Sequence, residues 1–454
     1  MLVLLLAGCA VGPTYQRPSV DTPVAFKEGQ GAWVSAAPGD LLERGPWWEL
    51  FRDPDLDALA AQVQVSNQNV AAAVAAYQQA RALVAQQRAS LFPTVNLDGS
   101  ANRSGGGGSK GGAHNSYTVQ IGGSWEPDVW GRLRYGVAAA RAGEQASLAD
   151  LQSATLSAQG ELATDYFNLR QLDAVRQLQA QTIAAYERSL RITRNRYHAG
   201  IAPMTDLLQA QTQLANAQAD QLGFERQRAT LEHAIAVLIG KAPANFTLPA
   251  RPTWQGFVPD IPFDVPSTLL QRRPDIASAE RQVAQANEQV GVARAAFFPS
   301  LTLSGSASSG AAVIGDLFKA SSLVWSLGAS LAQTVFDAGA RSAQVEQARA
   351  KLEQASARYR QTVLAAFGDI EDQLVASRVL QDQLVLRRQA SQAADLVEQQ
   401  VLNRYEAGQL SYTDVVTAQV TALTARRALA QSVSDRAVAA VALIQGLGGG
   451  WRGL

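Results

Sequence analysis

The chain contains a single cysteine, Cys9, and three histidines far apart in the sequence, His114, His198 and His233. One cysteine can neither form a disulfide within the chain nor supply a thiolate cluster for a metal. The histidines show no close ligand spacing such as HExxH, and the sequence lacks a GxxxxGK[ST] phosphate loop. Its GxSxG match at 107–111 lies in a glycine-rich polar turn between two strand patterns, so it is interpreted as a loop and not as a nucleophile elbow. The sequence therefore predicts a protein that is not an enzyme and that holds no metal or cofactor.

The residues before Cys9 point to lipid attachment as its chemistry. Residues 1–8, Met-Leu-Val-Leu-Leu-Leu-Ala-Gly, are apolar and end in small residues, as does the cleavage region of a secretory signal. The run is too short to span a bilayer as a helix, which takes about 20 residues. Because Leu-Ala-Gly-Cys has the form of a bacterial lipobox, we expect Cys9 to carry a covalent lipid. The alternative is a chance leader before an ordinary buried cysteine.

The overall charge is balanced. Among 454 residues, Lys plus Arg and Asp plus Glu both number 39, which gives a net charge of zero. Non-specific nucleic-acid binding needs a basic excess that neutralises phosphates, so the sequence excludes that class. The apolar content of 47% is enough to fill a core.

The second half of the sequence repeats the first. Residues 195–200 (Asn-Arg-Tyr-His-Ala-Gly) recur as residues 403–408 (Asn-Arg-Tyr-Glu-Ala-Gly), 208 positions later. Residues 91–94 (Leu-Phe-Pro-Thr) recur as residues 297–300 (Phe-Phe-Pro-Ser), 206 positions later. Matches in the same order at nearly one offset indicate an internal duplication.

Each copy contains two stretches in which apolar or small residues alternate with Ser, Thr, Asn and Gln. The four stretches are residues 94–101, 116–125, 301–308 and 322–331. Alternation with a period of two predicts strands, and about ten residues is the length of a tilted transmembrane strand. The polar face suits a water-filled lumen and the other face suits lipid. A soluble β-sandwich is the alternative.

Four strands cannot close a barrel, and open sheet edges are not tolerated in the hydrocarbon of a membrane. Two copies of the chain would give eight strands, a barrel that side chains fill. Three copies would give twelve strands and room for a channel, so the strand number favours a homotrimer.

Helices occupy most of the remaining sequence. We expect helices over about residues 55–90 and 266–296, each ended by a proline before the strands. Residues 131–199 contain no proline and are rich in Ala, Gln, Leu, Arg and Glu, which predicts one very long helix. Gly200 and Gly408 are expected as left-handed helix ends, with return helices running to about residues 239 and 445. Each copy is therefore a helix, two strands and a long helical hairpin.

The expected domain organisation follows from this duplication. We place a signal segment at 1–8, an anchor and collar segment at 9–52, the first repeat at 53–240, a proline-rich connector at 241–265, the second repeat at 266–445 and a tail at 446–454.

With these features in view, the sequence resembles the TolC-type outer membrane factors, and within them the NodT-like lipoprotein branch of resistance-nodulation-division efflux systems. The resemblance rests on Cys-Ala-Val-Gly-Pro-Thr-Tyr-Gln-Arg-Pro at 9–18, Trp-Trp-Glu-Leu-Phe at 47–51, Asp-Pro-Asp-Leu at 53–56, Trp-Gly-Arg at 130–132, Arg-Pro-Asp-Ile at 273–276 and the two Arg-Tyr-x-x-Gly turns. It implies a mainly α-helical protein with a membrane β-barrel. Three protomers would share a twelve-stranded barrel in the outer membrane and a periplasmic α-barrel of helical hairpins.

The resemblance also implies a function and partners. The protein would be a passive exit duct of a tripartite efflux pump, anchored by lipid in the outer membrane and extending into the periplasm. A periplasmic adaptor (membrane fusion) protein and an inner-membrane transporter would open it at its inner end. The alternatives are an outer-membrane duct for type I protein secretion and, in a different class, a periplasmic coiled-coil scaffold.

Site residues follow from the same resemblance. The implied gate residues are Asp206, Tyr405, Asp414 and Thr417, and the implied adaptor-docking tips are Gly200, Ile201, Ala202, Gly408, Gln409 and Leu410. Asp414 matches the first of two gate aspartates, whereas Thr417 stands at the second, so three chains would supply one carboxylate ring. Asp206 is expected to bond to Tyr405 in the closed state, and Leu410 replaces an arginine of a second lock. The alternative for both aspartates is capping of a helix start.

Overall fold

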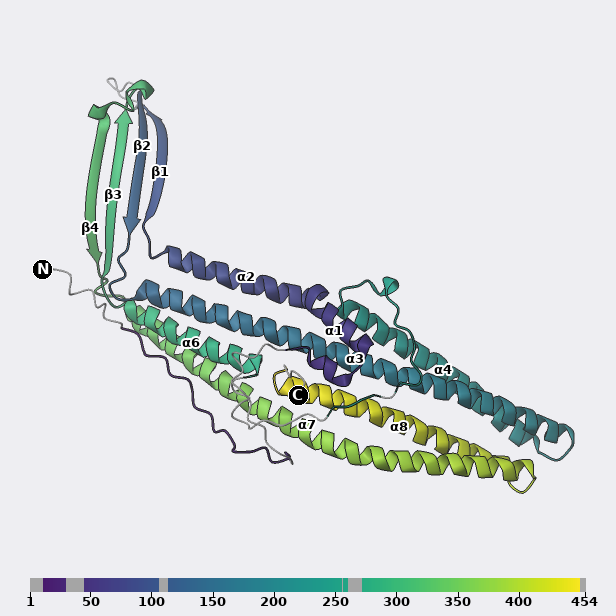
Figure 1. The fold of residues 1–454 in the computed structure, drawn as a ribbon. Helices are drawn as coiled ribbons and strands as arrows, with labels where there is room; N and C mark the ends of the chain where they lie inside the picture. The colour runs from purple at the N-terminus through teal and green to yellow at the C-terminus, as the bar shows by residue number, and fades with distance from the viewer. Residues whose placement is uncertain (1–10, 30–44, 106–112, 255, 260–271, 450–454) are drawn as a thin grey trace. The chain divides into compact units, whose positions relative to one another are not determined.

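The computed structural model describes residues 11–29, 45–105, 113–254, 256–259 and 272–449 (Figure 1). Cys9 and the expected helix start at Pro266 lie outside these residues. The chain divides into two compact units. Unit 1 comprises Met1–Val20, Ala75–Ala149 and Ser278–Thr362, and unit 2 comprises Asp21–Val74, Asp150–Ala277 and Val363–Leu454. In the described part of the chain, no helix is both long and apolar enough to cross a membrane.

Unit 1 contains one antiparallel sheet in the order β1-β2-β3-β4 (Figure 1). Its strands are β1 Thr94–Ser104, β2 His114–Trp125, β3 Ser300–Ala311 and β4 Leu323–Ala332. Each lies where alternation predicts a strand and has 10 to 12 residues, so the strand predictions are confirmed. β1 and β4 are the edges of the sheet and pair with no further strand among the described residues.

The register of the sheet separates an apolar face from a polar one. Cross-strand neighbours include Leu97–Ile121, Leu303–Ala329 and Ala307–Trp325 on the apolar face, and Thr94–Ser124, Thr302–Ser330 and Ser306–Ser326 on the polar face. The apolar face remains open: the side chains of Leu97 and Leu327 are 75% and 80% exposed. Within the described residues it meets no second sheet, which argues against the soluble sandwich.

Each pair of strands is followed by a long helical hairpin. The first hairpin is α3 Arg132–His198 with α4 Met204–Leu238, and the second is α7 Ala340–Glu406 with α8 Tyr412–Gly446. α3 and α7 have 67 residues each, which is about 100 Å at 1.5 Å per residue. The shorter helices α2 Gln68–Ala89 and α6 Pro274–Ala295 precede the strands. The predicted duplicated, mainly helical fold is confirmed.

The first predicted helix is wrong in one respect, because residues 55–90 form two helices. α1 Pro54–Ser66 ends at Asn67, whose backbone is extended with ψ 125°, and α2 begins at the next residue. The buried Asn67 side chain holds this break. Its Oδ1 accepts from the backbone N–H groups of Asn69 at 2.9 Å and Val70 at 3.1 Å, and its Nδ2 donates to the Leu238 carbonyl at 2.8 Å. Asn67 therefore caps α2 and ties it to the end of α4.

We predict that Asn67→Ala destabilises the protein by about 1–2 kcal/mol, since it removes a helix cap and leaves the buried Leu238 carbonyl without its side-chain donor. A lower melting temperature of the purified protein measures this loss. Asn69→Ala is the matched control: its exposed side chain makes no such bonds, and its backbone N–H remains available to Asn67. Equal melting temperatures for the two variants would contradict the capping role.

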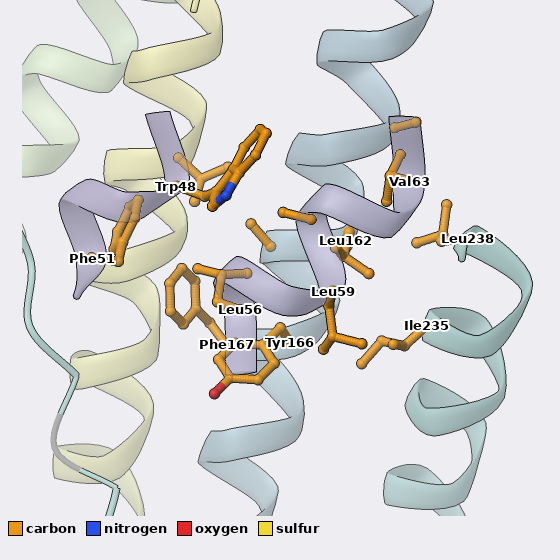
Figure 2. Packing of buried hydrophobic residues seen from close by; sticks show 14 of the residues in the cluster. Trp48, Phe51, Leu56, Leu59, Val63, Leu162, Tyr166, Phe167, Ile235 and Leu238 are labelled. Atoms are coloured by element: carbon orange, nitrogen blue, oxygen red, sulfur yellow. The ribbon is translucent and has the colours of Figure 1, made fainter. Parts of the chain in front are cut away.

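The core of unit 2 joins both repeats (Figure 2). Figure 2 shows Leu56 and Leu59 of α1 facing Leu162, Tyr166 and Phe167 of α3. The aromatic residues of the short 3-10 helix Trp47–Phe51 and apolar residues from the ends of α4 and α8 complete the cluster. The N-terminal segment around Trp47 is therefore built into the helical core of unit 2.

A buried charge cluster lies beside this core. Arg170 is fully buried and donates to Asp173 at 2.9 Å, to Asp55 at 3.0 Å and to the Pro249 carbonyl at 2.8 Å. The equally buried side chain of Asp173 also accepts from Arg228 of α4 at 2.7 Å. These ionic hydrogen bonds tie the start of α1, the helices α3 and α4, and the connector after α4 to one another.

Candidate functional site

The tips of the two helical hairpins share one geometry, which follows from their repeated sequence. Gly200 and Gly408 have φ values of 74° and 76°, in the left-handed region that favours glycine. The N–H of Ile201 donates to the Arg196 carbonyl at 2.8 Å, and that of Gln409 donates to the Arg404 carbonyl at 2.9 Å. The predicted glycine helix ends are confirmed. Gly200, Ile201, Gly408 and Gln409 are exposed and Ala202 and Leu410 are partly buried, so the expected docking tips lie mostly at the surface.

At the base of these tips, Tyr405 of α7 is held by two residues of α3. The hydroxyls of Tyr405 and Thr193 lie 3.0 Å apart. The Arg196 guanidinium donates to the Tyr405 carbonyl at 2.7 Å and lies 4.8 Å from the centre of the Tyr405 ring. Tyr405 is 2% exposed, so these contacts are shielded from water. We call Thr193, Arg196 and Tyr405 the tip clamp, because they join the first hairpin to the second.

The expected bond between Asp206 and Tyr405 is not formed in this structure. The Tyr405 hydroxyl is paired with Thr193, and the described residues show no side-chain hydrogen bond of Asp206. Asp206 lies in the first turn of α4, where its negative carboxylate interacts favourably with the helix dipole. Asp206 also affects the pKa of Tyr412. Burial raises this pKa, and electrostatic interactions with Tyr405, Tyr186 and Asp206 raise it further.

Sequence reasoning missed Thr193 and Arg196. Arg196 belongs to the repeated Asn-Arg-Tyr motif that identified the duplication, so a signal for it was present. The repeat itself is symmetric, however, and its second arginine, Arg404, is exposed and makes no side-chain hydrogen bond or ion pair within the described part of the chain. Only the packing of the two hairpins shows which arginine is used.

A polar stripe runs along α8 from the second tip. Its exposed members are Asp414, Thr417, Thr421 and Thr424, spaced three or four residues apart. Asp414 closes a capping box with Ser411: its Oδ2 accepts from the Ser411 N–H at 3.0 Å. The capping alternative for Asp414 is thus confirmed, and its exposed carboxylate is at the same time the only charged group of the stripe.

The N-terminal segment that follows Cys9 is attached to unit 1. The Gly12 N–H donates to the Tyr135 hydroxyl of α3 at 2.7 Å. Arg17 Nε donates to the Tyr359 hydroxyl of α7 at 3.0 Å. Residues 11–20 therefore contact one long helix from each repeat directly after the expected lipid site.

Solved structures define the class of protein to which this fold and site belong. The outer-membrane channel OprN superposes with a TM-score of 0.87 at 29% identity, covering 98% of this chain and 100% of that one. The open-state MtrE outer membrane channel of Neisseria gonorrhoeae also gives a TM-score of 0.87 at 29% identity, covering 97% and 98%. The chain has the fold of an outer-membrane channel subunit.

Sequence comparison gives the family. Residues 52–241 and 265–449 match the family described as outer membrane efflux protein, and the chain belongs to it. Proteins of this family are passive channels of the outer membrane. The probable efflux pump outer membrane protein TtgC of Pseudomonas putida is 31% identical over 98% of this chain and 94% of its own length. The cation efflux system protein CusC of Escherichia coli is 28% identical over 99% and 98%.

Proposed function

We propose that three copies of this chain form a passive outer-membrane duct that catalyses no reaction and serves a tripartite efflux pump. The proposal rests on the four-stranded sheet, which has one exposed apolar face, one polar face and two unpaired edges. Exposed edges cannot remain in hydrocarbon, and pairing β4 of one copy with β1 of the next removes all of them. Twelve strands then enclose a lumen lined by Ser and Thr.

The gate of this duct lies at the hairpin tips. The tip clamp fixes the second hairpin to the first, and we infer that this contact holds the resting, closed state. On α8, Asp414 and Thr417 would face the axis, so that three chains present one ring of carboxylates instead of two. Opening requires the second hairpin to leave Thr193 and Arg196.

The partners follow from the same proposal. An adaptor protein in the periplasm would dock on the tips around Ile201 and Gln409 and an inner-membrane transporter of the resistance-nodulation-division type would supply the energy. The names of the relatives favour solute efflux over protein secretion, since they include a cation efflux protein and the pyoverdine export protein OpmQ of Pseudomonas aeruginosa, which is 32% identical. The exposed apolar sheet does not suit a coiled-coil scaffold.

Ion conductance tests the duct itself. Purified protein reconstituted into planar bilayers should give discrete but infrequent conductance steps, since the clamp keeps the resting state mostly closed. Bilayers that show no steps with wild-type protein or with any tip-clamp variant would contradict the channel.

We also propose that Cys9 carries the lipid anchor. Wild-type protein expressed with its leader is expected to incorporate labelled fatty acid, and Cys9→Ala is expected to lose all of it, because the chain has no other cysteine. The contacts of Gly12 and Arg17 should persist in the variant, so its folded helices serve as the control. Label retained in Cys9→Ala, or absent from wild-type protein, would contradict the anchor.

A further inference from the structure

A polar recess lies at one end of the sheet in unit 1, where the strands join the helices. β1 and β3 begin, and β2 and β4 end, at this edge. The recess has a volume of about 160 Å³, several times the ~30 Å³ that one water occupies in the liquid. Its lining includes Glu126, Asp128, Trp130, Arg132, Phe298 and Arg341.

Charges of both signs are paired around this recess. Arg132 donates to Glu126 through Nη2 at 2.7 Å and through Nε at 3.3 Å. Arg134 is paired with Asp128 at 3.1 Å. The side chains of Arg132 and Glu126 are 43% and 31% exposed, so this pair is open to a ligand. The two pairs have no net charge.

Aromatic residues mark the depth of the recess in the proposed membrane. Trp130 stacks on Phe298 with ring centres 4.8 Å apart and donates its indole N–H to the Pro299 carbonyl at 2.7 Å. Phe92, just before β1, and Phe336, just after β4, are 66% and 85% exposed. Exposed aromatic rings at the ends of membrane strands lie at the level of lipid headgroups. The recess is therefore expected among headgroups and not in hydrocarbon or bulk water.

The paired charges still have hydrogen-bonding capacity. A guanidinium has five N–H donors, of which Arg132 uses two on Glu126. A carboxylate can accept about four hydrogen bonds, so Glu126 can take further donors. A ligand with one anionic and one cationic group can bind such a pair without breaking it. A purely anionic ligand offers no hydrogen-bond donor to the Glu126 carboxylate.

We propose that this recess binds the phosphoethanolamine headgroup of a membrane phospholipid. The phosphate accepts from Arg132, and the ammonium, with three N–H donors, binds the exposed carboxylate of Glu126. The Asp128 carboxylate already accepts from the backbone N–H groups of Leu133 and Arg134 and from Arg134 Nε. A phosphocholine headgroup has the same charges but no N–H donor, so it can satisfy only the arginine. The inference rests on the proposed insertion of the sheet in the outer membrane.

Native mass spectrometry of the detergent-purified full-length protein tests the proposal. The protein is incubated with equimolar phosphatidylethanolamine, phosphatidylcholine and phosphatidylglycerol that share the same acyl chains. We expect wild-type protein to retain phosphatidylethanolamine at least fivefold over either competitor. The double variant Glu126→Gln with Arg132→Gln keeps the net charge and should lose this preference. Glu126→Gln alone leaves Arg132 unpaired and should shift binding toward phosphatidylglycerol.

Arg103→Gln, at the opposite end of β1, is the matched control and should bind as wild type does. Wild-type protein that prefers phosphatidylglycerol, or a double variant that keeps the phosphatidylethanolamine preference, would overturn the proposal. Failure of the proposed duct is distinguishable, because the protein would then not be recovered from the outer membrane. A protein that is recovered there and shows no lipid preference contradicts the headgroup site alone.

Discussion

Arg196→Gln is expected to raise the open-to-closed ratio of the resting channel at least tenfold. The substitution removes an ionic hydrogen bond to the Tyr405 carbonyl and a guanidinium over the Tyr405 ring. A hydrogen bond to a charged group contributes about 1.5–3 kcal/mol, and a cation–π contact about 0.5–1 kcal/mol. A free-energy change of about 1.4 kcal/mol alters an equilibrium tenfold. Loss of both contacts in a single protomer is therefore enough to raise the open-to-closed ratio tenfold. Single-channel recording in planar bilayers measures it as open probability.

The duplicated sequence supplies the control for this experiment. Arg404→Gln changes the equivalent arginine of the second repeat, which is exposed and unpaired within the described residues. It should leave the open probability at the wild-type value. Thr193→Val should open the channel less than Arg196→Gln, since it removes one neutral hydrogen bond. Equal open probabilities for Arg196→Gln and Arg404→Gln would contradict the clamp.

Asp206→Ala separates the clamp from the lock implied by family resemblance. The structure shows no bond between Asp206 and Tyr405, so we expect a smaller change than with Arg196→Gln. A larger effect of Asp206→Ala would mean that Asp206, and not Arg196, fastens the resting state.

The second large effect is expected from Arg170→Met, which should destabilise the protein by about 3–5 kcal/mol. Arg170 is fully buried, and its removal takes one of the two arginines from the equally buried Asp173. It also leaves the Pro249 carbonyl without its donor. Breaking a buried ion pair in this way costs far more than an exposed pair contributes, because a buried charge loses its compensation. Thermal unfolding of the purified protein measures the loss.

Arg176→Met on the same helix is the control. Arg176 and Glu225 lie 3.8 Å apart with side chains that are 33% and 43% exposed. Exposed pairs of this kind contribute about 0–1 kcal/mol, so the melting temperature should change little. If Arg170→Met is no more damaging than Arg176→Met, the charge cluster is not what holds the connector to the helices.

The sequence was sufficient for the features that depend on periodicity. The strands around Leu97 and Trp325 were found at their positions because the sheet has one polar and one apolar face, and each face repeats every second residue. The hairpin ends were found because Gly200 and Gly408 are the residues that tolerate a positive φ. Both signals are local in the sequence, and each occurs twice because the sequence is duplicated.

Features that depend on packing were missed. The break at Asn67 has no proline or glycine, and it exists because the Asn67 side chain reaches the Leu238 carbonyl of a distant helix. The matching motif predicts Asp206 as the partner of Tyr405, yet the Tyr405 hydroxyl pairs with that of Thr193, 212 residues away in sequence. The spacing of residues within one helix or strand cannot predict contacts of this kind between distant elements.

The native mass of the protein extracted from outer membranes in mild detergent shows whether several chains share one barrel. One chain supplies four strands with two open edges, so we expect a complex of three chains. A trimer recovered from the outer membrane fraction is the expected result. A monomer or dimer, or a protein that does not fractionate with the outer membrane, would contradict the shared barrel.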